Sequence, residues 1–84
     1  MSGAQEPAKA ARTVLAKGAS GEQVMVLQRL LNAAGYQVSL DGQFGPITSR
    51  AVKAFQRRRS LLPDSVVGPT TWRALVGDTE AGEA

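Results

Sequence analysis

The strongest constraint on the fold of this chain is a repeat within its own sequence. The segment from Asp41 to Val52 (DGQFGPITSRAV) aligns with the segment from Asp64 to Leu75 (DSVVGPTTWRAL) at an offset of 23 residues. Aspartate, glycine, proline, threonine, arginine and alanine occur at matching positions in both segments. Gly-Pro suits a helix start, because the N–H that proline lacks would be unpaired there anyway. The repeat therefore predicts a loop-then-helix unit that is used twice.

A further helix is predicted ahead of the repeat. Its apolar residues recur at the i, i+3 and i+7 spacing of a single helix face, namely Val24, Leu27 and Leu31. Ser20 suits the N-cap of this helix, and Gln23 three positions later completes a capping box. Gly35 suits its C-terminal end, where glycine readily takes the left-handed conformation. We therefore expect this helix to span residues 20–34.

The two repeats predict the remaining helices. The first is expected to run from Pro46 to about Arg59 and to bury the apolar side chains of its inner face, Ile47, Ala51, Val52 and Phe55. The second begins at Pro69 and is expected to stop at Gly77. Together the segments predict an all-α chain, a compact three-helix fold with an internal loop-helix repeat and short extended loop segments.

One small domain accounts for most of the chain. The length of 84 residues suits a single compact core, which we place in residues 14–77. Residues 1–13 and 78–84 hold almost no large apolar side chains, so we expect a flexible N-terminal tail and a flexible acidic C-terminal tail. No apolar run approaches the ~18 residues of a membrane span, and the first residues lack the pattern of a secretory signal. We therefore expect no membrane span.

The residue types that are missing exclude several kinds of chemistry. The chain has neither cysteine nor histidine. Without them it has no disulfide, no thiol nucleophile, no His-based triad and no ordinary zinc site, so we expect neither a metal nor a cofactor. Asp41 and Asp64 are candidates for the two carboxylates of a glycosidase. Each one, however, begins a turn before Gly-Pro, where aspartate has a structural use, so we do not expect an enzyme.

The charge is mildly basic and has one conspicuous cluster. The net charge is +3, from ten basic and seven acidic residues. Arg57, Arg58 and Arg59 either complement the carbonyl end of a helix or form a patch that contacts phosphates. Aromatic residues make up only 5% of the chain and are not interleaved with the basic ones. Nucleic acid is therefore the less favoured partner.

The sequence allows two roles for several polar residues. Gln28 and Gln56 follow core apolar positions, where an amide side chain either ties down the backbone of a neighbouring loop or lines a groove. Thr48 and Thr71 each lie three residues after the glycine of a helix start. Hydroxyl groups serve helix ends well, so we favour a structural role for both threonines.

Two aromatic residues flank the loop that begins at Asp41. Tyr36 precedes this loop and Phe44 lies within it. Aromatic side chains at a loop edge stack on sugar faces or on peptide side chains, or else they plug a small core from above. The sequence leaves both roles open.

These motifs together resemble a known family. The matching positions are Gly18-x-x-Gly21-x-x-Val24-x-x-Leu27-Gln28-x-x-Leu31-x-x-x-Gly35-Tyr36, then Asp41-Gly42-x-Phe44-Gly45-Pro46-x-Thr48, Ala51-Val52-x-x-Phe55-Gln56 and Val67-Gly68-Pro69-x-Thr71-Trp72-x-x-Leu75. Over about residues 15–76 the chain is similar to the small peptidoglycan-binding domain that accompanies many bacterial and phage cell-wall hydrolases.

The resemblance implies a three-helix module without catalytic activity that anchors an associated protein to the cell wall. It implies peptidoglycan as the partner, through its stem peptide, its glycan or both, together with an attached or associated cell-wall hydrolase. We expect a monomer that acts at the wall, in the periplasm or outside the cell, if it is part of an exported protein. In the family the ligand groove lies near the first helix and the Asp-Gly-x-Phe-Gly loop, which gives as candidates Gln28, Tyr36, Asp41, Gly42, Gln43, Phe44, Gly45 and Thr48.

The second half departs from the family pattern. The family usually has glycine near position 60 and Asp-Gly in the second loop, whereas this chain has Ser60 and Asp64-Ser65. Loss of these permissive glycines predicts that the second loop turns differently and argues against a ligand role there. Two other functions stay open: a protein–protein interaction module with the same fold, and, less favoured, a basic nucleic-acid-binding domain.

Overall fold

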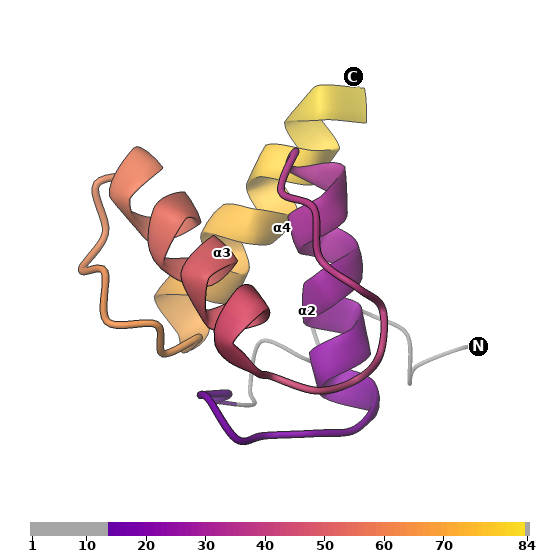
Figure 1. Cartoon of the computed structure of the whole chain (residues 1–84). Helices are drawn as coiled ribbons and strands as arrows, with labels where there is room; N and C mark the ends of the chain where they lie inside the picture. The colour runs from indigo at the N-terminus through magenta and orange to yellow at the C-terminus, as the bar shows by residue number, and fades with distance from the viewer. Residues whose placement is uncertain (1–13, 84) are drawn as a thin grey trace.

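A computed structural model describes residues 14–83, and within them three helices make up the fold (Figure 1). They are α2 (Glu22–Ala33), α3 (Pro46–Arg58) and α4 (Pro69–Glu83). Within these residues no strand forms, and two isolated antiparallel bridges provide the short extended segments, Leu15 with Val67 and Ser20 with Gln43. The prediction of an all-α three-helix fold is confirmed. No helix in this range has the length and apolar content needed to cross a membrane.

The two ends of α2 were predicted with different success. At the C-terminal end Gly35 has a φ of 102°, and its N–H donates to the Asn32 carbonyl at 3.0 Å, as predicted for a left-handed helix end. At the N-terminal end the prediction of a Ser20 cap is wrong. Gly21 is the N-cap residue, no side chain caps the helix, and the Gly21 N–H instead donates to the Gly42 carbonyl at 2.9 Å. A neighbouring loop, rather than a hydroxyl group, satisfies this end of the helix.

The predicted end of the last helix is wrong. Gly77 does not stop α4, which continues to Glu83. Glycine ends a helix when it takes a positive φ, and Gly77 is not among the glycines of the described residues that do so. The predicted flexible tail at 1–13 lies outside the described residues.

One residue of the predicted apolar face of α3 is exposed. The buried face consists of Thr48, Ala51, Val52, Phe55 and Gln56, which recur at helical spacing. Ile47 falls off this stripe and is 57% exposed, so the prediction that it is buried is wrong.

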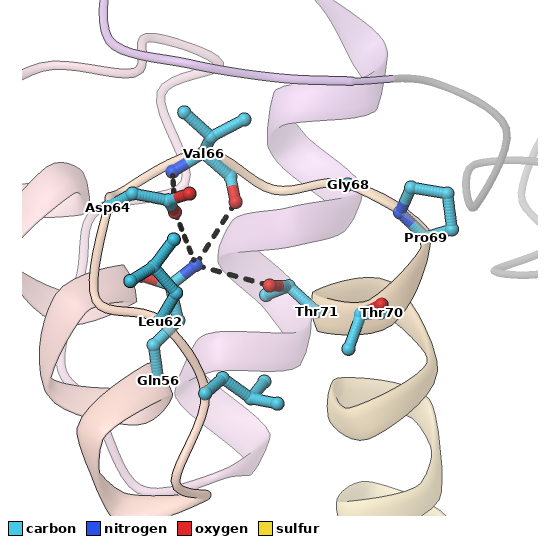
Figure 2. A pocket seen from close by; sticks show the side chains of 9 residues that line it. Gln56, Leu62, Asp64, Val66, Gly68, Pro69, Thr70 and Thr71 are labelled. Carbon is cyan, nitrogen blue, oxygen red and sulfur yellow. Dashed lines mark hydrogen bonds between the residues drawn. The ribbon is translucent and has the colours of Figure 1, made fainter.

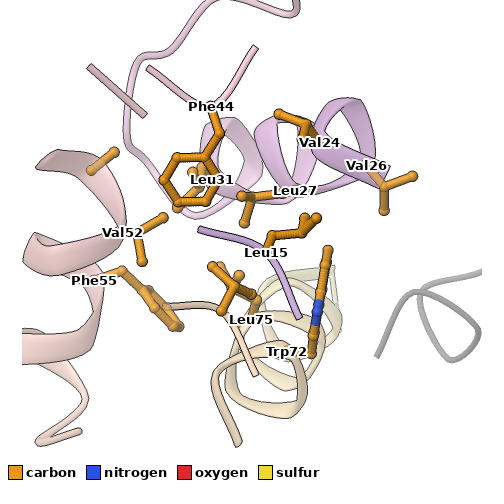
Figure 3. Close-up of a cluster of buried hydrophobic side chains, with 12 residues drawn as sticks. Leu15, Val24, Val26, Leu27, Leu31, Phe44, Val52, Phe55, Trp72 and Leu75 are labelled. Atoms are coloured by element: carbon orange, nitrogen blue, oxygen red, sulfur yellow. The ribbon is translucent and has the colours of Figure 1, made fainter. Parts of the chain in front are cut away.

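The core lies between the three helices, and α2 contacts both α3 and α4. Its largest buried side chains are those of Trp72, Phe44 and Phe55, which are all at most 2% exposed (Figure 3). Phe44 therefore plugs the core from the loop between α2 and α3. This loop runs back along α2 toward the N-terminal end of that helix before α3 begins (Figure 1).

The segment at residues 15–20, here called the N-terminal strap, pairs with both repeats. Leu15 exchanges two backbone hydrogen bonds with Val67, of 3.0 and 2.8 Å. The Phe44 N–H donates to the Ala19 carbonyl at 2.9 Å, and the Gly18 N–H donates to the Phe44 carbonyl at 2.9 Å. Phe44 and Val67 occupy the same position of the 23-residue repeat, so a single segment fastens both loops.

Candidate functional site

A buried glutamine organises the loop between α2 and α3. Gln28 extends from α2 and is 1% exposed. Its Nε2 donates to Asp41 Oδ1 at 3.0 Å, to the Gln43 carbonyl at 3.0 Å and to Thr48 Oγ1 at 3.1 Å. Its Oε1 accepts from the Gly42 N–H at 3.0 Å. Of the two readings of Gln28, the structure favours the one in which the amide ties down the loop.

Asp41 closes the turn of this loop. Its Oδ1 also accepts the Gln43 N–H at 2.9 Å, which makes a local side-chain turn. This backbone hydrogen bond, with the Gln28 amide second, lowers the pKa of the exposed Asp41 carboxyl below its ordinary value. The carboxylate is therefore ionised at neutral pH, and each of these hydrogen bonds goes to Oδ1 rather than to Oδ2.

Glycine is favoured inside the same turn. Gly42 has a φ of 71°, in the left-handed region. A Cβ atom at this position would lie 3.3 Å from Met25 Cγ and 3.4 Å from the Gly21 carbonyl oxygen. Both the backbone conformation and these tight contacts thus favour glycine here.

The second repeat contains the same network. Gln56 on α3 is 1% exposed, and its Nε2 donates to Asp64 Oδ1 at 3.2 Å, to the Val66 carbonyl at 3.0 Å and to Thr71 Oγ1 at 3.1 Å (Figure 2). Its Oε1 accepts from the Ser65 N–H at 3.0 Å. Every hydrogen bond of the Gln28 network thus has a counterpart in the Gln56 network. Sequence alone leaves two roles open for Gln56: tying down the backbone of a loop and lining a groove.

The prediction that the second loop turns differently is wrong. Ser65 has a φ of 64° and Ser60 a φ of 61°, so both serines take the left-handed conformation that glycine takes in the first repeat. The Ser65 hydroxyl pairs with the Ser49 hydroxyl at 2.6 Å. The Ser60 N–H donates to the Arg57 carbonyl at 3.1 Å, which matches the bond that Gly35 makes at the end of α2. Hydrogen bonds to residues of α3 hold these serines in a conformation that is unfavourable for them.

Two shallow hollows adjoin each other above the first network. The first cleft has a volume of about 300 Å³ and is lined by Ser39, Asp41, Gln43, Gly45, Pro46, Ile47 and Thr48. The second hollow, here called the Tyr36 hollow, measures about 500 Å³ and is lined by Gly35, Tyr36, Gln37, Ile47, Arg50, Ala51 and Ala54. Ile47 lines both, so its exposed side chain joins the two hollows into one surface.

The eight residues predicted for the site fall into two groups. Four are within reach of a ligand, because Asp41 and Gln43 are exposed and Tyr36 and Gly45 are half-buried. The other four are buried, although Thr48 also lines the first cleft: Gln28, Gly42, Phe44 and Thr48. The structure thus brings the predicted residues together, half of them as a frame and half as a surface.

Tyr36 is held in place by neighbours on α3. Its ring meets the Phe55 ring edge to face, with the ring centroids 6.2 Å apart. Arg58 Nη1 donates to the Tyr36 hydroxyl at 3.5 Å. The tyrosine ring therefore presents a positioned face to the hollow rather than a freely moving one.

Several residues that line this surface were not predicted as site residues. Ser39, Ile47 and Arg50 are exposed and face the two hollows. Ile47 stands four residues before Ala51 and eight before Phe55, so helical spacing in the sequence gave no signal of its exposure. Among the side chains that the structure describes, those of residues 14–77, no group of three or more acidic, histidine or cysteine residues could hold a metal ion.

The comparisons with known proteins agree on one family. Residues 20–75 match the family described as a peptidoglycan binding domain. N-acetylmuramoyl-L-alanine amidase CwlL of Bacillus licheniformis is 40% identical over 77 residues, which cover 88% of this chain and 21% of the amidase. The zinc D-Ala-D-Ala carboxypeptidase of Streptomyces albus G is 42% identical over 66 residues, which cover 73% of this chain and 25% of the carboxypeptidase. The chain thus spans a quarter or less of the length of these two relatives.

Solved structures give the same result. The crystal structure of the SleB N-terminal domain is similar with a TM-score of 0.78 and 39% identity, over 81% of this chain and 94% of that domain. A Burkholderia AP3 phage endolysin is similar with a TM-score of 0.74 and 41% identity, over 75% of this chain and 24% of the endolysin.

Proposed function

This chain belongs to the family of peptidoglycan binding domains, and we propose that the first cleft and the Tyr36 hollow together form its ligand surface. The module is a peptidoglycan-binding one. One observation supports this location. The two hollows meet at Ile47, an exposed apolar residue, and the loop beneath them is fixed by the buried Gln28 network. A rigid frame beneath an exposed surface suits recognition, because little conformational entropy is lost when a ligand binds.

Each exposed residue offers a distinct contact to peptidoglycan. Asp41 Oδ2 is an acceptor for an amide, amino or hydroxyl group of the ligand. The Tyr36 ring provides a face for a sugar or a peptide side chain, and Ile47 provides an apolar contact between the two hollows. Arg50 provides a cation for a carboxylate of the stem peptide. Gln43 and Gly45 complete the contact surface.

The buried candidates serve the frame. We assign to Gln28, Gly42, Phe44 and Thr48 the task of holding the loop, with no direct contact to the ligand. The stem peptide, rather than the glycan alone, is the favoured ligand portion, because an ionised carboxylate and a guanidinium group match its amide and carboxylate groups.

The biological role that we propose is targeting. The matched relatives include an amidase and a carboxypeptidase that are several times longer than this chain, which supports a module that holds an attached or associated cell-wall hydrolase at the wall. The folded unit, which we place at residues 14–77, has no catalytic activity of its own and works as a monomer at the cell wall. We expect a dissociation constant of ~10–1000 μM for one shallow site, which repeated sites on an insoluble polymer would strengthen.

The test is retention on insoluble peptidoglycan at low and high salt. The informative variant is Ile47→Arg, which fills the junction of the two hollows at an exposed position. Because this change adds positive charge, a loss of retention cannot come from weaker attraction to an anionic wall. Ala33→Arg, at an exposed position of α2 that lines neither hollow, is the matched control.

Two results decide the proposal. We expect salt-resistant retention of the natural chain and of Ala33→Arg, and a loss of at least ten-fold for Ile47→Arg. Retention that disappears in high salt, or in a variant with Arg57, Arg58 and Arg59 all changed to alanine, would instead show adsorption by charge. No retention at all would favour a protein partner. Circular dichroism of each variant checks that it is folded.

A further inference from the structure

A second cleft lies at the loop between α3 and α4 (Figure 2). Its volume is about 290 Å³, close to the volume of about 300 Å³ of the first cleft. Every residue that lines the first cleft has a counterpart 23 positions later that lines the second: Leu62, Asp64, Val66, Gly68, Pro69, Thr70 and Thr71. Gln56 and Leu61 complete the lining. The internal repeat therefore extends from the fold to the surface.

The aspartates of the two clefts have the same hydrogen-bond pattern. Asp64 Oδ1 accepts from Gln56 Nε2 at 3.2 Å and from the Val66 N–H at 3.0 Å, as Asp41 Oδ1 does from its own partners. In both clefts the hydrogen bonds of the carboxylate go to Oδ1, and the aspartate side chain is exposed. The second cleft thus presents the same acceptor, in the same frame, as the cleft proposed to bind peptidoglycan.

The clefts carry their apolar side chains at different positions. Ser39 and Gln43 of the first cleft are replaced by Leu62 and Val66 in the second, whereas Ile47 is replaced by Thr70. Leu62 is 75% exposed and Val66 is 37% exposed, although the Gln56 network needs only the backbone of Val66. The second cleft therefore places two exposed apolar side chains beside a carboxylate acceptor.

We propose that the second cleft is a second binding site for the same polymer, and that it takes a stretch of stem peptide with small apolar side chains. This inference rests on the proposed function of the first cleft. An N–H group of the peptide would donate to Asp64, and a methyl group such as that of alanine would contact Leu62 and Val66.

Two sites on one small module change how it is held by a polymer. A wall polymer presents the same peptide many times, so that binding at one cleft raises the effective concentration at the other. Loss of either cleft is then expected to weaken retention on the intact wall far more than it weakens binding of a short fragment at the remaining cleft.

The experiment is a titration of the ¹⁵N-labelled chain with soluble disaccharide–peptide fragments from digested peptidoglycan, followed by amide chemical shifts. We expect saturable shifts in residues 41–48 and, separately, in residues 64–71. Thr70→Arg, at an exposed position, is expected to abolish the second set and leave the first, whereas its repeat counterpart Ile47→Arg does the reverse. On insoluble peptidoglycan Thr70→Arg is expected to weaken retention ~10-fold or more.

The outcomes separate the two proposals. Shifts confined to residues 41–48, with Thr70→Arg retained like the natural chain, would overturn the second site and leave the proposed function intact. Shifts confined to residues 64–71 would support the second site and overturn the first. No shift and no retention would overturn both. Equal shifts with a glycan fragment that lacks peptide would overturn the assignment to the stem peptide. Leu62 is 75% exposed in the natural chain, so Leu62→Ser serves as the second variant if Thr70→Arg does not fold.

Discussion

The two repeats reach one geometry with different residues. In the first, Gly35 ends the helix and Gly42 makes the turn, and in the second Ser60 and Ser65 occupy the same left-handed conformations. What the repeats share is the buried glutamine with its aspartate and threonine partners. The comparison teaches that a buried amide with its acceptors sets the shape of the loop, and that glycine only lowers the strain.

A second factor, absent at the counterpart Ser65, favours glycine at position 42. A Cβ at this position would approach Met25 to 3.3 Å. When the chain is aligned so that Gln28 matches Gln56, an offset of 28 residues, Lys53 takes the position of Met25, and its side chain is exposed. Tolerance of a side chain at the turn therefore depends on the neighbouring helix as well as on the loop.

Replacement of the buried glutamines is expected to have the largest effect on stability. Gln28→Leu and Gln56→Leu each remove the partner of one buried backbone N–H and of several acceptors. We expect each to lower the free energy of unfolding by about 3–4 kcal/mol, since unsatisfied buried groups cost about 1–3 kcal/mol each. Urea unfolding followed by the fluorescence of the buried Trp72 measures this, with exposed Gln37→Leu as control. Losses that differ by more than about 2 kcal/mol would show that the two networks are not equivalent.

Exchange of the turn residues comes next in size. Gly42→Ser is expected to destabilise the chain by about 2 kcal/mol, from the left-handed backbone and the contact with Met25. Ser65→Gly is expected to change stability by less than about 1 kcal/mol, because relief of the same strain offsets loss of the hydrogen bond to Ser49. The same unfolding measurement compares them. Equal and opposite effects would contradict the additional role of Met25.

Ser60 offers a smaller change in the opposite direction. Ser60→Gly is expected to stabilise the chain by about 1 kcal/mol, because the side chain is exposed and the backbone is left-handed. For a domain of this size the melting temperature would rise by roughly 4–8 °C. Ser60→Ala keeps the Cβ and is the control, for which we expect no rise. A rise of equal size with alanine would rule out backbone strain as the cause.

The smallest expected effect is the pH dependence carried by Asp41. Its pKa is lowered in the folded chain from an ordinary value of 3.8 by the hydrogen bonds from Gln43 and Gln28. The folded state thus holds this proton less tightly than the unfolded state, so the contribution to stability is present above about pH 4 and is lost as pH falls through the folded pKa. An NMR titration of the carboxyl group measures this shift directly. In Asp41→Asn the dependence should disappear, and an unchanged acid profile would assign it to other groups.

The sequence predicted the helices well because their signals are local. Apolar spacing, the Gly-Pro pairs and Gly35 each act within a few residues, and the structure confirms the helices that they indicate. The errors at Ser20 and Gly77 have another source. The start of α2 is satisfied by a distant carbonyl, that of Gly42, and a glycine within a helix ends it only when its φ becomes positive.

The site was predicted less completely, because it depends on contacts between residues that are far apart in the sequence. The first loop was found because its glycines match the family pattern, whereas Ser65 concealed the second loop. Nothing local shows that a serine will be held left-handed by Gln56, which is nine residues away in sequence. Helical spacing placed Ile47 with the buried Ala51 and Phe55, so its exposure, like its place at the junction of two hollows, depends on how α3 packs in the fold.

The N-terminal strap has a consequence for how the chain acquires its structure. Leu15 is among the first described residues to leave the ribosome, yet its partner Val67 is among the last. A nascent chain that ends after the first repeat has no Val67 to close against, and it also lacks Trp72 and Leu75 of the core. We therefore expect folding in a single cooperative step that waits for the second repeat, at a rate limited by this distant closure. The strap thus couples the folding of the first repeat to that of the second.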